Sequence, residues 1–160
     1  MSEAIVQFGR QHHLTGILYR PTQHDSDIAV VIISAGATHK VGPFRLGVDV
    51  ARHFNHDSLC SLRFDLGGIG ESRYLKGNGQ TYDQHIASDL TDCLDFLQSN
   101  YGFTKFIAVG LCTGADNAHK LAVVDKRVIG VVCLDGYAYP TWRFHLINSI
   151  RKMEKLRRLP

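Results

Sequence analysis

Residues Gly110-Leu111-Cys112-Thr113-Gly114 combine a nucleophile with a spacing that can expose it. The pattern of glycine, any residue, nucleophile, any residue, glycine is that of a nucleophile elbow, here with cysteine in place of serine. Such a turn holds its nucleophile on strained backbone between a strand and a helix, where side chains two residues to either side would collide. Glycine at Gly110 and Gly114 removes that collision. The alternative is a structural cysteine in an ordinary turn.

The residues around this turn favour the elbow. Apolar residues 106–109 predict a short buried strand, and residues 115–124 predict a helix. Cys112 would then lie at the N-terminus of that helix, where unpaired N–H groups favour a thiolate. A thiolate can attack a carbonyl carbon with less help from a base than a serine hydroxyl needs.

The rest of the chain predicts the scaffold that would position this turn. Alternating residues at 4–8 and 14–19 predict an antiparallel hairpin. The further expected elements are strands at 28–33, 59–64 and 128–134 and helices at 44–54, 82–97 and 142–159. The continuous apolar runs among these strands are typical of strands buried on both faces. A hairpin followed by repeated strand–helix units indicates an α/β fold, with a mostly parallel sheet covered by helices on both faces, in a single domain over residues 1–160.

Composition narrows the class of protein. The chain has 160 residues, 44% of them hydrophobic and 21% charged, which is ordinary for a globular domain with a real core. No basic leader or long apolar run is present, so we expect no secretion signal, no membrane span and a cytoplasmic location. The four cysteines lack metal-ligand spacing, and Cys60, Cys93 and Cys133 are predicted to be reduced core thiols. No metal or cofactor is expected, since the glycines at 67, 68 and 70 lack dinucleotide-binding spacing.

Charge is concentrated near the C-terminus. The net charge is +3, and residues 143–158 hold six Lys or Arg against one Glu. A basic segment of this kind can bind nucleic acid or anionic lipid. The alternative, a solvated helix face, is favoured because no nucleic-acid motif occurs elsewhere in the chain. We therefore expect no nucleic-acid partner.

Three blocks carry a resemblance to a known family. They are Gly36-Ala37-Thr38-His39-Lys40-Val41-Gly42-Pro43-Phe44-Arg45, then Arg63-Phe64-Asp65-Leu66-Gly67-Gly68-Ile69-Gly70-Glu71-Ser72, and the elbow itself. In this order the sequence resembles the N-terminal half of an α/β-hydrolase. It looks most like bacterial serine-hydrolase-type members with a cysteine-bearing elbow, including those associated with exosortase systems. The blocks match the loops after the third, fourth and fifth strands of that fold.

The resemblance implies roles for individual residues. Cys112 would be the nucleophile, and the backbone N–H groups of Thr113 and Ala37 would form the oxyanion hole. Asp65 is expected to shape the turn after its strand together with Arg63. The resemblance implies an acyl hydrolase acting on esters or thioesters, with acyl transfer or a non-catalytic interaction module as alternatives.

The family places its triad acid after the seventh strand and its histidine after the eighth, which lie beyond the six strands expected here. Asp135, directly after the last expected strand, is a candidate acid, and its alternative role is that of a turn residue. His39 is the candidate base. Residues 137–160 resemble the start of a lid. The apolar strand at 128–134 would form a sheet edge, so we expect it to pair with a missing C-terminal half or with another subunit.

Overall fold

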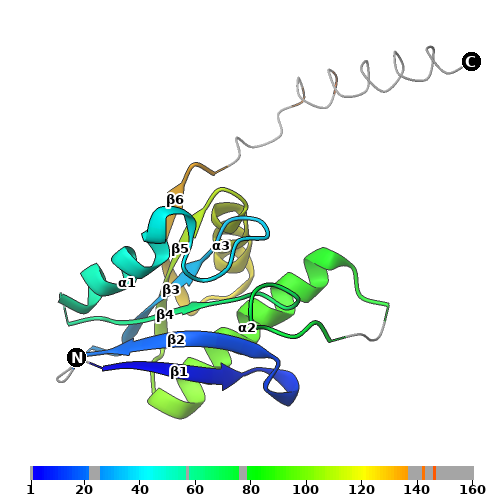
Figure 1. Cartoon of the computed structure of the whole chain (residues 1–160). Helices are drawn as coiled ribbons and strands as arrows, with labels where there is room; N and C mark the ends of the chain where they lie inside the picture. The colour runs from blue at the N-terminus through cyan, green and yellow to red at the C-terminus, as the bar shows by residue number, and fades with distance from the viewer. Residues whose placement is uncertain are drawn as a thin grey trace, which may run out of the picture.

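The computed structural model describes residues 2–21, 26–56, 58–75 and 79–136, together with Trp142 and Leu146. In chain order the elements are β1 (Ser2–Phe8), η1 (Arg10–His12), β2 (Leu14–Arg20), β3 (Ile28–Ile33), η2 (Pro43–Arg45), α1 (Leu46–His56), β4 (Cys60–Phe64), α2 (Tyr82–Tyr101), β5 (Lys105–Leu111), α3 (Thr113–Val124) and β6 (Val128–Leu134). The six strands form one sheet in the order β1-β2-β4-β3-β5-β6 (Figure 1).

The sheet is mixed in the way the sequence predicts. The hairpin β1–β2 is antiparallel, and β2 also runs antiparallel to β4. The other pairs, β4–β3, β3–β5 and β5–β6, are parallel. The carboxyl ends of β3, β4, β5 and β6 therefore lie along one edge of the sheet, which is where parallel α/β folds place their sites.

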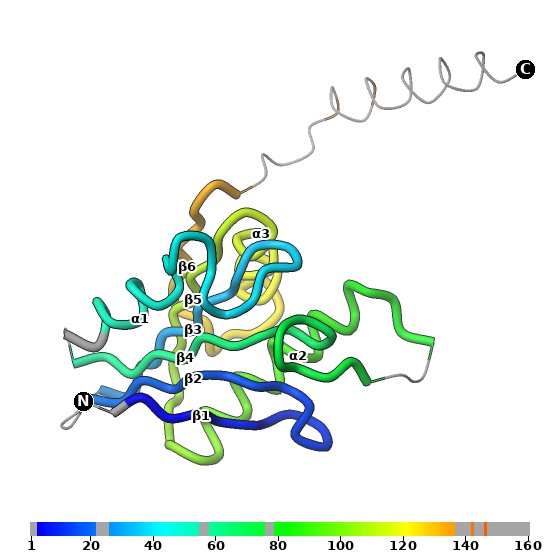
Figure 2. Tube along the Cα trace, viewed as in Figure 1, coloured from blue at the N-terminus to red at the C-terminus, as the bar shows by residue number. Residues whose placement is uncertain are grey.

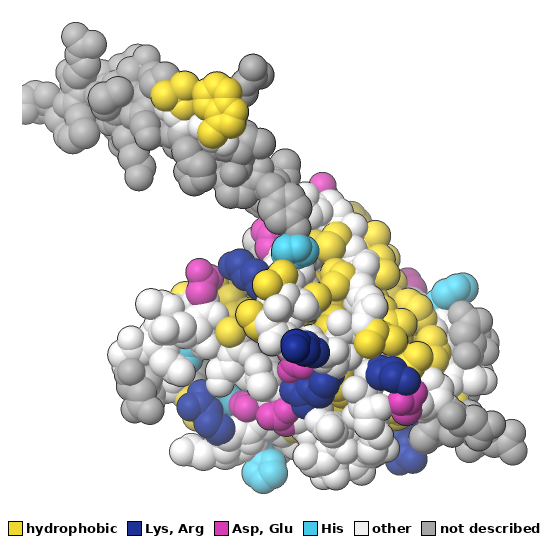
Figure 3. Space-filling model, turned by 180° about the vertical axis from the view of Figure 1, so that it is seen from behind, with side chains coloured by type: hydrophobic (Ala, Val, Ile, Leu, Met, Phe, Trp, Pro, Cys, Tyr) yellow, Lys and Arg dark blue, Asp and Glu magenta, His cyan; other side chains and the backbone are white. Residues whose placement is uncertain are grey.

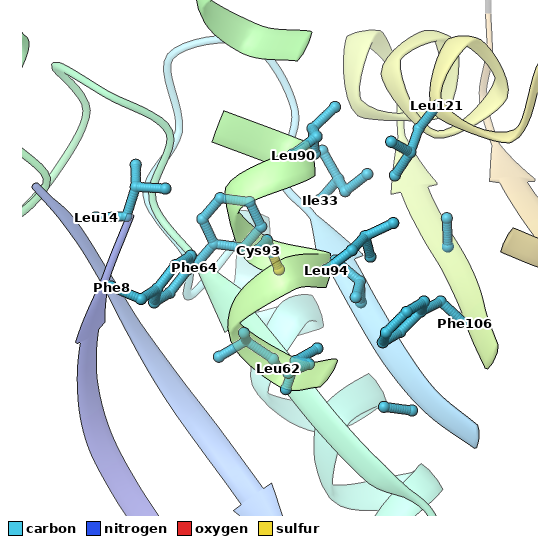
Figure 4. Packing of buried hydrophobic residues seen from close by; sticks show 14 of the residues in the cluster. Phe8, Leu14, Ile33, Leu62, Phe64, Leu90, Cys93, Leu94, Phe106 and Leu121 are labelled. Carbon is cyan, nitrogen blue, oxygen red and sulfur yellow. The ribbon is translucent and has the colours of Figure 1, made fainter. Parts of the chain in front are cut away.

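Helices cover both faces, as expected. One core cluster lies between the sheet and the helices α2 and α3, and Figure 4 shows Leu90, Cys93 and Leu94 of α2 packed over the strands among its members. A smaller cluster on the opposite face joins Ala51 of α1 to Val30, Ile32 and other strand residues. The sheet is thus held from both sides, which fixes the strand ends that carry the candidate site.

Helix α2 runs four residues beyond the predicted end at residue 97. It begins with a capping box, in which Thr81 Oγ1 accepts from the Gln84 N–H at 3.4 Å and Gln84 Oε1 accepts from the Thr81 N–H at 2.8 Å. It ends at Gly102, which has φ +78° and donates its N–H to Gln98 O at 2.9 Å. Glycine is the residue that most easily adopts this left-handed C-terminal cap, so it sets the end of the helix.

The helix predicted at 44–54 begins later than expected. Phe44 and Arg45 have φ of +50° and +64°, so they belong to the short turn η2 and not to an α-helix. The chain is still turning there, because Gly42 N–H donates to His39 O and Gly47 N–H donates to Val41 O. Helix α1 therefore spans Leu46–His56.

Strand β6 forms where predicted, at the edge of the sheet, but it is not buried on both faces. Cys133 is exposed on it, so the prediction of a core thiol there is wrong, whereas Cys60 and Cys93 are buried as expected. The edge position was predicted, but an apolar sequence does not show which side chains of an edge strand are covered. The helix expected at 142–159 and the lid-like segment 137–160 lie outside the described residues, except for Trp142 and Leu146.

Candidate active site

Cys112 occupies a strained turn between β5 and α3. Its φ is +52° and its ψ is −119°, a conformation that non-glycine residues rarely adopt. A Cβ added at Gly110 would lie 2.1 Å from Gly114 O, and one added at Gly114 would lie 2.4 Å from Ile33 O. Both glycines are therefore required by close backbone contacts, as the elbow spacing predicts.

The backbone of Cys112 is fixed on both sides. Its N–H donates to Leu134 O of β6 at 2.8 Å, and its carbonyl accepts from the Ala115 N–H at 2.9 Å as α3 begins. The Cys112 side chain makes no capping hydrogen bond to the helix, and the residue is only partly buried. Hydrogen bonds on both sides thus hold the backbone of this turn, while the thiol stays accessible at the carboxyl ends of the parallel strands.

The loop after β3 reaches the elbow. Gly36 N–H donates to Thr113 Oγ1 at 2.5 Å, a contact between residues 77 positions apart. Figure 2 shows this loop, in blue to cyan, beside the start of α3. Thr113 is the first residue of α3, where backbone N–H groups have no partner within the helix. Ala37, the predicted second oxyanion donor, is exposed at the tip of the same loop.

The two candidate acid–base residues lie on different loops at this edge. Asp135 directly follows Leu134, whose carbonyl binds the Cys112 N–H, and it is exposed with φ +51°. That left-handed backbone is typical of a turn residue. His39 is exposed in the β3–η2 loop, and its Nδ1 accepts from the Val41 N–H at 3.3 Å. In the neutral ring this leaves the proton on Nε2.

Asp65 has a structural role, but its main partner is not the expected one. It is fully buried, its Oδ2 accepts from Lys40 Nζ at 2.7 Å, and its Oδ1 accepts from the Lys40 N–H at 2.5 Å. Lys40 Nζ also pairs with Glu71. Burial would lower the pKa of Lys40, but the bonds to Asp65 and Glu71 outweigh it and raise the pKa. Arg63 instead reaches Lys40 O, at 3.5 Å.

This cluster fixes the base of the loop that carries Gly36 and Ala37. Lys40 comes three residues after Ala37, and its backbone and side chain are both bound to the carboxylate at the end of β4. Sequence reasoning missed Lys40, which lies in the first of the three blocks. The signal was an isolated cation in an otherwise uncharged loop, which does not by itself identify a buried partner.

A buried histidine–carboxylate pair lies elsewhere along the same edge. His13 Nε2 is 2.9 Å from Asp89 Oδ1, and His13 Nδ1 is 2.8 Å from Arg10 O. Asp89 Oδ2 accepts from the Gly67 N–H at 2.8 Å. This resembles two members of a triad, but His13 precedes β2, which is three strand positions from β5, or about 14 Å at normal strand spacing. Both ring nitrogens are engaged, so the pair joins the hairpin to α2.

The remaining thiols differ sharply in accessibility. Burial raises the pKa of Cys60 to about 12 and raises that of Cys93 well above its usual value. Both thiols are therefore protonated at neutral pH and shielded from reagents. Cys133 is exposed, and its Sγ lies 3.7 Å from Ala115 O. It is a natural internal comparison for Cys112, since both thiols lie near the start of α3.

Two other kinds of feature are absent from the described residues. No group of three or more His, Cys, Asp or Glu in the described part of the chain could hold a metal ion. No helix within the same residues is long and apolar enough to cross a membrane.

Known proteins resemble this one in structure. No family model and no curated protein matches the sequence. The structure is similar to that of the α/β hydrolase GrgF from Penicillium sp. sh18, with a TM-score of 0.72 and 21% identity over 98% of this chain and 54% of that one. It is also similar to an esterase from Pyrococcus furiosus, with a TM-score of 0.72 and 19% identity over 99% and 57% of the two chains. A cold-adapted esterase from an Arctic intertidal metagenomic library has a TM-score of 0.62 at 20% identity, over 82% and 58%.

These likenesses establish the fold. The described strands and helices have the α/β-hydrolase fold. The chain spans a little over half the length of the solved structures it matches. Since one fold serves many activities, function has to be argued from the site.

Proposed function

We propose that this chain carries the nucleophile and oxyanion hole of an acyl hydrolase, acting on an ester or thioester through Cys112. The conformation of Cys112 is the observation that supports this most. A non-glycine residue with φ +52°, flanked by two glycines that no other residue could replace without displacing backbone, is costly to maintain. Its result is a thiol that is accessible at the N-terminus of a helix.

The proposed reaction begins with the Cys112 thiolate. It attacks the carbonyl carbon, forming a C–S bond while the carbonyl π electrons move to oxygen. The Thr113 and Ala37 N–H groups stabilise that oxyanion, each worth roughly 3–4 kcal/mol in comparable sites. The intermediate collapses, the bond to the leaving thiolate or alkoxide breaks, and the leaving group takes a proton from solvent. Cys112 is left as an acyl-thioester.

Release of the acyl group needs an activated acceptor. Water releases the acid in hydrolysis, whereas an alcohol, amine or thiol takes the acyl group in transfer, and either acceptor must lose a proton to a base. His39 is the candidate base. Its Nδ1 lone pair accepts the Val41 N–H in this structure, so His39 can take a proton only when that bond opens. Asp135 is the candidate acid, since its backbone adjoins that of Cys112 through Leu134. Because neither is placed against the thiol by a hydrogen bond, we expect slow deacylation in this chain alone.

The test is intact mass of the purified chain after exposure to an activated short-chain thioester. Wild type, Cys112→Ala and Cys112→Ser are compared in a Cys133→Ser background, which removes the other exposed thiol. The expected result is one acyl adduct on the protein that retains Cys112 and none on either variant. If the three proteins behave alike, the elbow does not act as a nucleophile and the proposal fails.

The edge strand favours a second candidate, that of an interaction module. Ile129, Val132 and Leu134 are exposed on β6. Figure 3, which shows the molecule from behind, has a group of hydrophobic side chains, in yellow, on this side. An apolar edge strand is a template for strand addition. We propose that β6 accepts a further strand along its open side.

Hydrogen exchange and sedimentation test this second candidate. Outward-facing amides of β6 are expected to exchange fast in the isolated chain and to slow when the edge is paired. Val132→Lys, which places a charge on the edge, is expected to abolish that protection. Protection that grows with protein concentration would identify a second copy as the partner. Fast exchange at every concentration and with every candidate partner would oppose the idea.

A further inference from the structure

The side chain of Thr113 links the two parts of the oxyanion hole. Its hydroxyl oxygen accepts the Gly36 N–H at 2.5 Å, while its own backbone N–H lies at the first position of α3. The contact joins the residue after the nucleophile to the loop after β3, which otherwise belong to separate strand–helix units. A hydrogen bond that spans this gap can set the separation of the two donors.

The loop that Thr113 holds is a tight turn. Thr38 donates its N–H to Ala35 O at 2.9 Å and its hydroxyl to the same oxygen at 2.5 Å. Gly36 has φ +49°, so the turn uses a conformation that favours glycine. Beyond it, Lys40 is bound to Asp65. The loop is therefore closed at Thr38 and anchored at Lys40, and Gly36 is its point of attachment to the elbow.

The turn leaves the backbone N–H of Ala37 exposed. The N–H groups of Gly36 and Thr38, on either side of it, are both engaged. Ala37 itself is exposed at the tip, and no hydrogen bond joins its N–H to another described residue. The turn thus satisfies the neighbouring donors and leaves the Ala37 N–H available.

We infer that Thr113 is a positioning residue whose hydroxyl, by holding Gly36, keeps the Ala37 N–H beside its own N–H so that both address one oxygen. The inference rests on the proposed acyl chemistry of Cys112. In this role the hydroxyl acts on the loop, not on the substrate or the thiol. It acts only in a step that develops charge on a carbonyl oxygen, because only that step uses the two donors together.

Two reagents separate this role from a merely structural one. A thioester acylates Cys112 through an oxyanion, whereas iodoacetamide alkylates it by displacement of iodide at carbon, with no oxyanion at all. Thr113→Val removes the hydroxyl and keeps the branched shape and a similar helix propensity. Thr113→Ser keeps a hydroxyl. Thr91→Val is the matched control, because Thr91 is an exposed helix threonine whose hydroxyl binds only Ala87 O of its own helix.

The rates of both reactions at Cys112 are measured by mass spectrometry in the Cys133→Ser background. We expect Thr113→Val to slow acylation about tenfold to a hundredfold, less than the 10²–10³ lost with a whole donor, because a loosened donor is misplaced and not absent. Alkylation by iodoacetamide is expected to stay at the wild-type rate. Thr113→Ser should restore acylation to near the wild-type rate, and Thr91→Val should change neither.

Other outcomes overturn the inference. Equal slowing of both reactions by Thr113→Val would mean that the hydroxyl supports the elbow as a whole. Unchanged acylation in that variant, with wild type acylated normally, would remove Thr113 from any role while leaving the function of Cys112 intact. Alkylation without acylation in wild type would refute the acyl chemistry itself, and this inference with it.

Discussion

Replacing Gly110 by alanine tests whether the elbow has the geometry described. The added Cβ would lie 2.1 Å from Gly114 O, about 0.9 Å short of the 3.0 Å below which real Cβ contacts essentially never occur. The next atoms, Gly114 C and Ala115 N at 2.3 and 2.5 Å, are also backbone, so no side-chain rotation can relieve the contact. Either β5 or the first turn of α3 has to move.

The size of the effect follows from that rigidity. Overpacking a well-packed site costs typically 1–3 kcal/mol and occasionally more. With three backbone atoms in the way, we expect Gly110→Ala to lower the free energy of unfolding by about 3 kcal/mol. For a chain of this length that is a fall in Tm of about 6–12 °C. The rate of Cys112 alkylation should also change, because the turn that exposes the thiol has to be rebuilt.

Gly130→Ala is the control. Gly130 lies on β6, the strand next to β5, and its added Cβ would meet only Ile107 side-chain atoms, the nearest at 3.7 Å. We expect a change within about 0.5 kcal/mol. Thermal unfolding followed by circular dichroism measures both variants. If Gly110→Ala unfolds at the temperature of Gly130→Ala, α3 does not approach β5 as described, and the argument from glycine spacing is refuted.

Three further predictions concern buried groups. Lys40→Met should destabilise the fold by about 3–5 kcal/mol in urea unfolding, because it leaves the Asp65 carboxylate buried without its cation. Because the pKa of Lys40 is raised in the folded state, this stabilisation should be complete below the unfolded-state pKa of about 10.4 and should be lost, in wild type only, as the pH rises through the higher folded-state pKa. Cys60 and Cys93 should resist iodoacetamide in the native protein and react only in denaturant, and native alkylation of either, seen by peptide mapping, would contradict their burial. His13→Leu should cost about 1–3 kcal/mol, because Asp89 Oδ1 loses its histidine partner while Oδ2 keeps the Gly67 N–H. The measurement is the urea midpoint, which should fall; an unchanged midpoint would mean that the pair contributes nothing.

The sequence predicted best what depends on neighbours along the chain. The collision at Gly110 is with Gly114 and Ala115, so the spacing alone predicts it, whereas the collision at Gly114 is with Ile33 and Ser34 of a distant segment, which the spacing does not show. The capping residues of α2 are equally local. By contrast, Lys40 finds its carboxylate 25 residues away and His13 finds its own 76 residues away. No pattern in either segment identifies such a partner, so both contacts were missed.

Two expectations, at β6 and at η2, were wrong in part. The edge position of the strand at 128–134 was predicted, but its apolar run does not show which of its side chains are covered, so Cys133 was wrongly expected in the core. Phe44 and Arg45 follow Gly-Pro in the way a helix start does, yet their left-handed backbone is set by hydrogen bonds of the preceding loop.

Because the proposed nucleophile is a cysteine, the two steps of the reaction, attack and deacylation, make different demands on the site. Attack requires a nucleophilic sulfur and two oriented N–H groups, the roles proposed for Cys112, Thr113 and Ala37. Deacylation requires proton transfer, for which His39 is the candidate. Cys112→Ser separates the two, because a serine hydroxyl needs the base for the first step as well. Acylation of the serine variant would therefore show that a base reaches the elbow, and its loss on adding His39→Gln would identify that base. Absence of acylation, with wild type acylated, would place the base outside these residues.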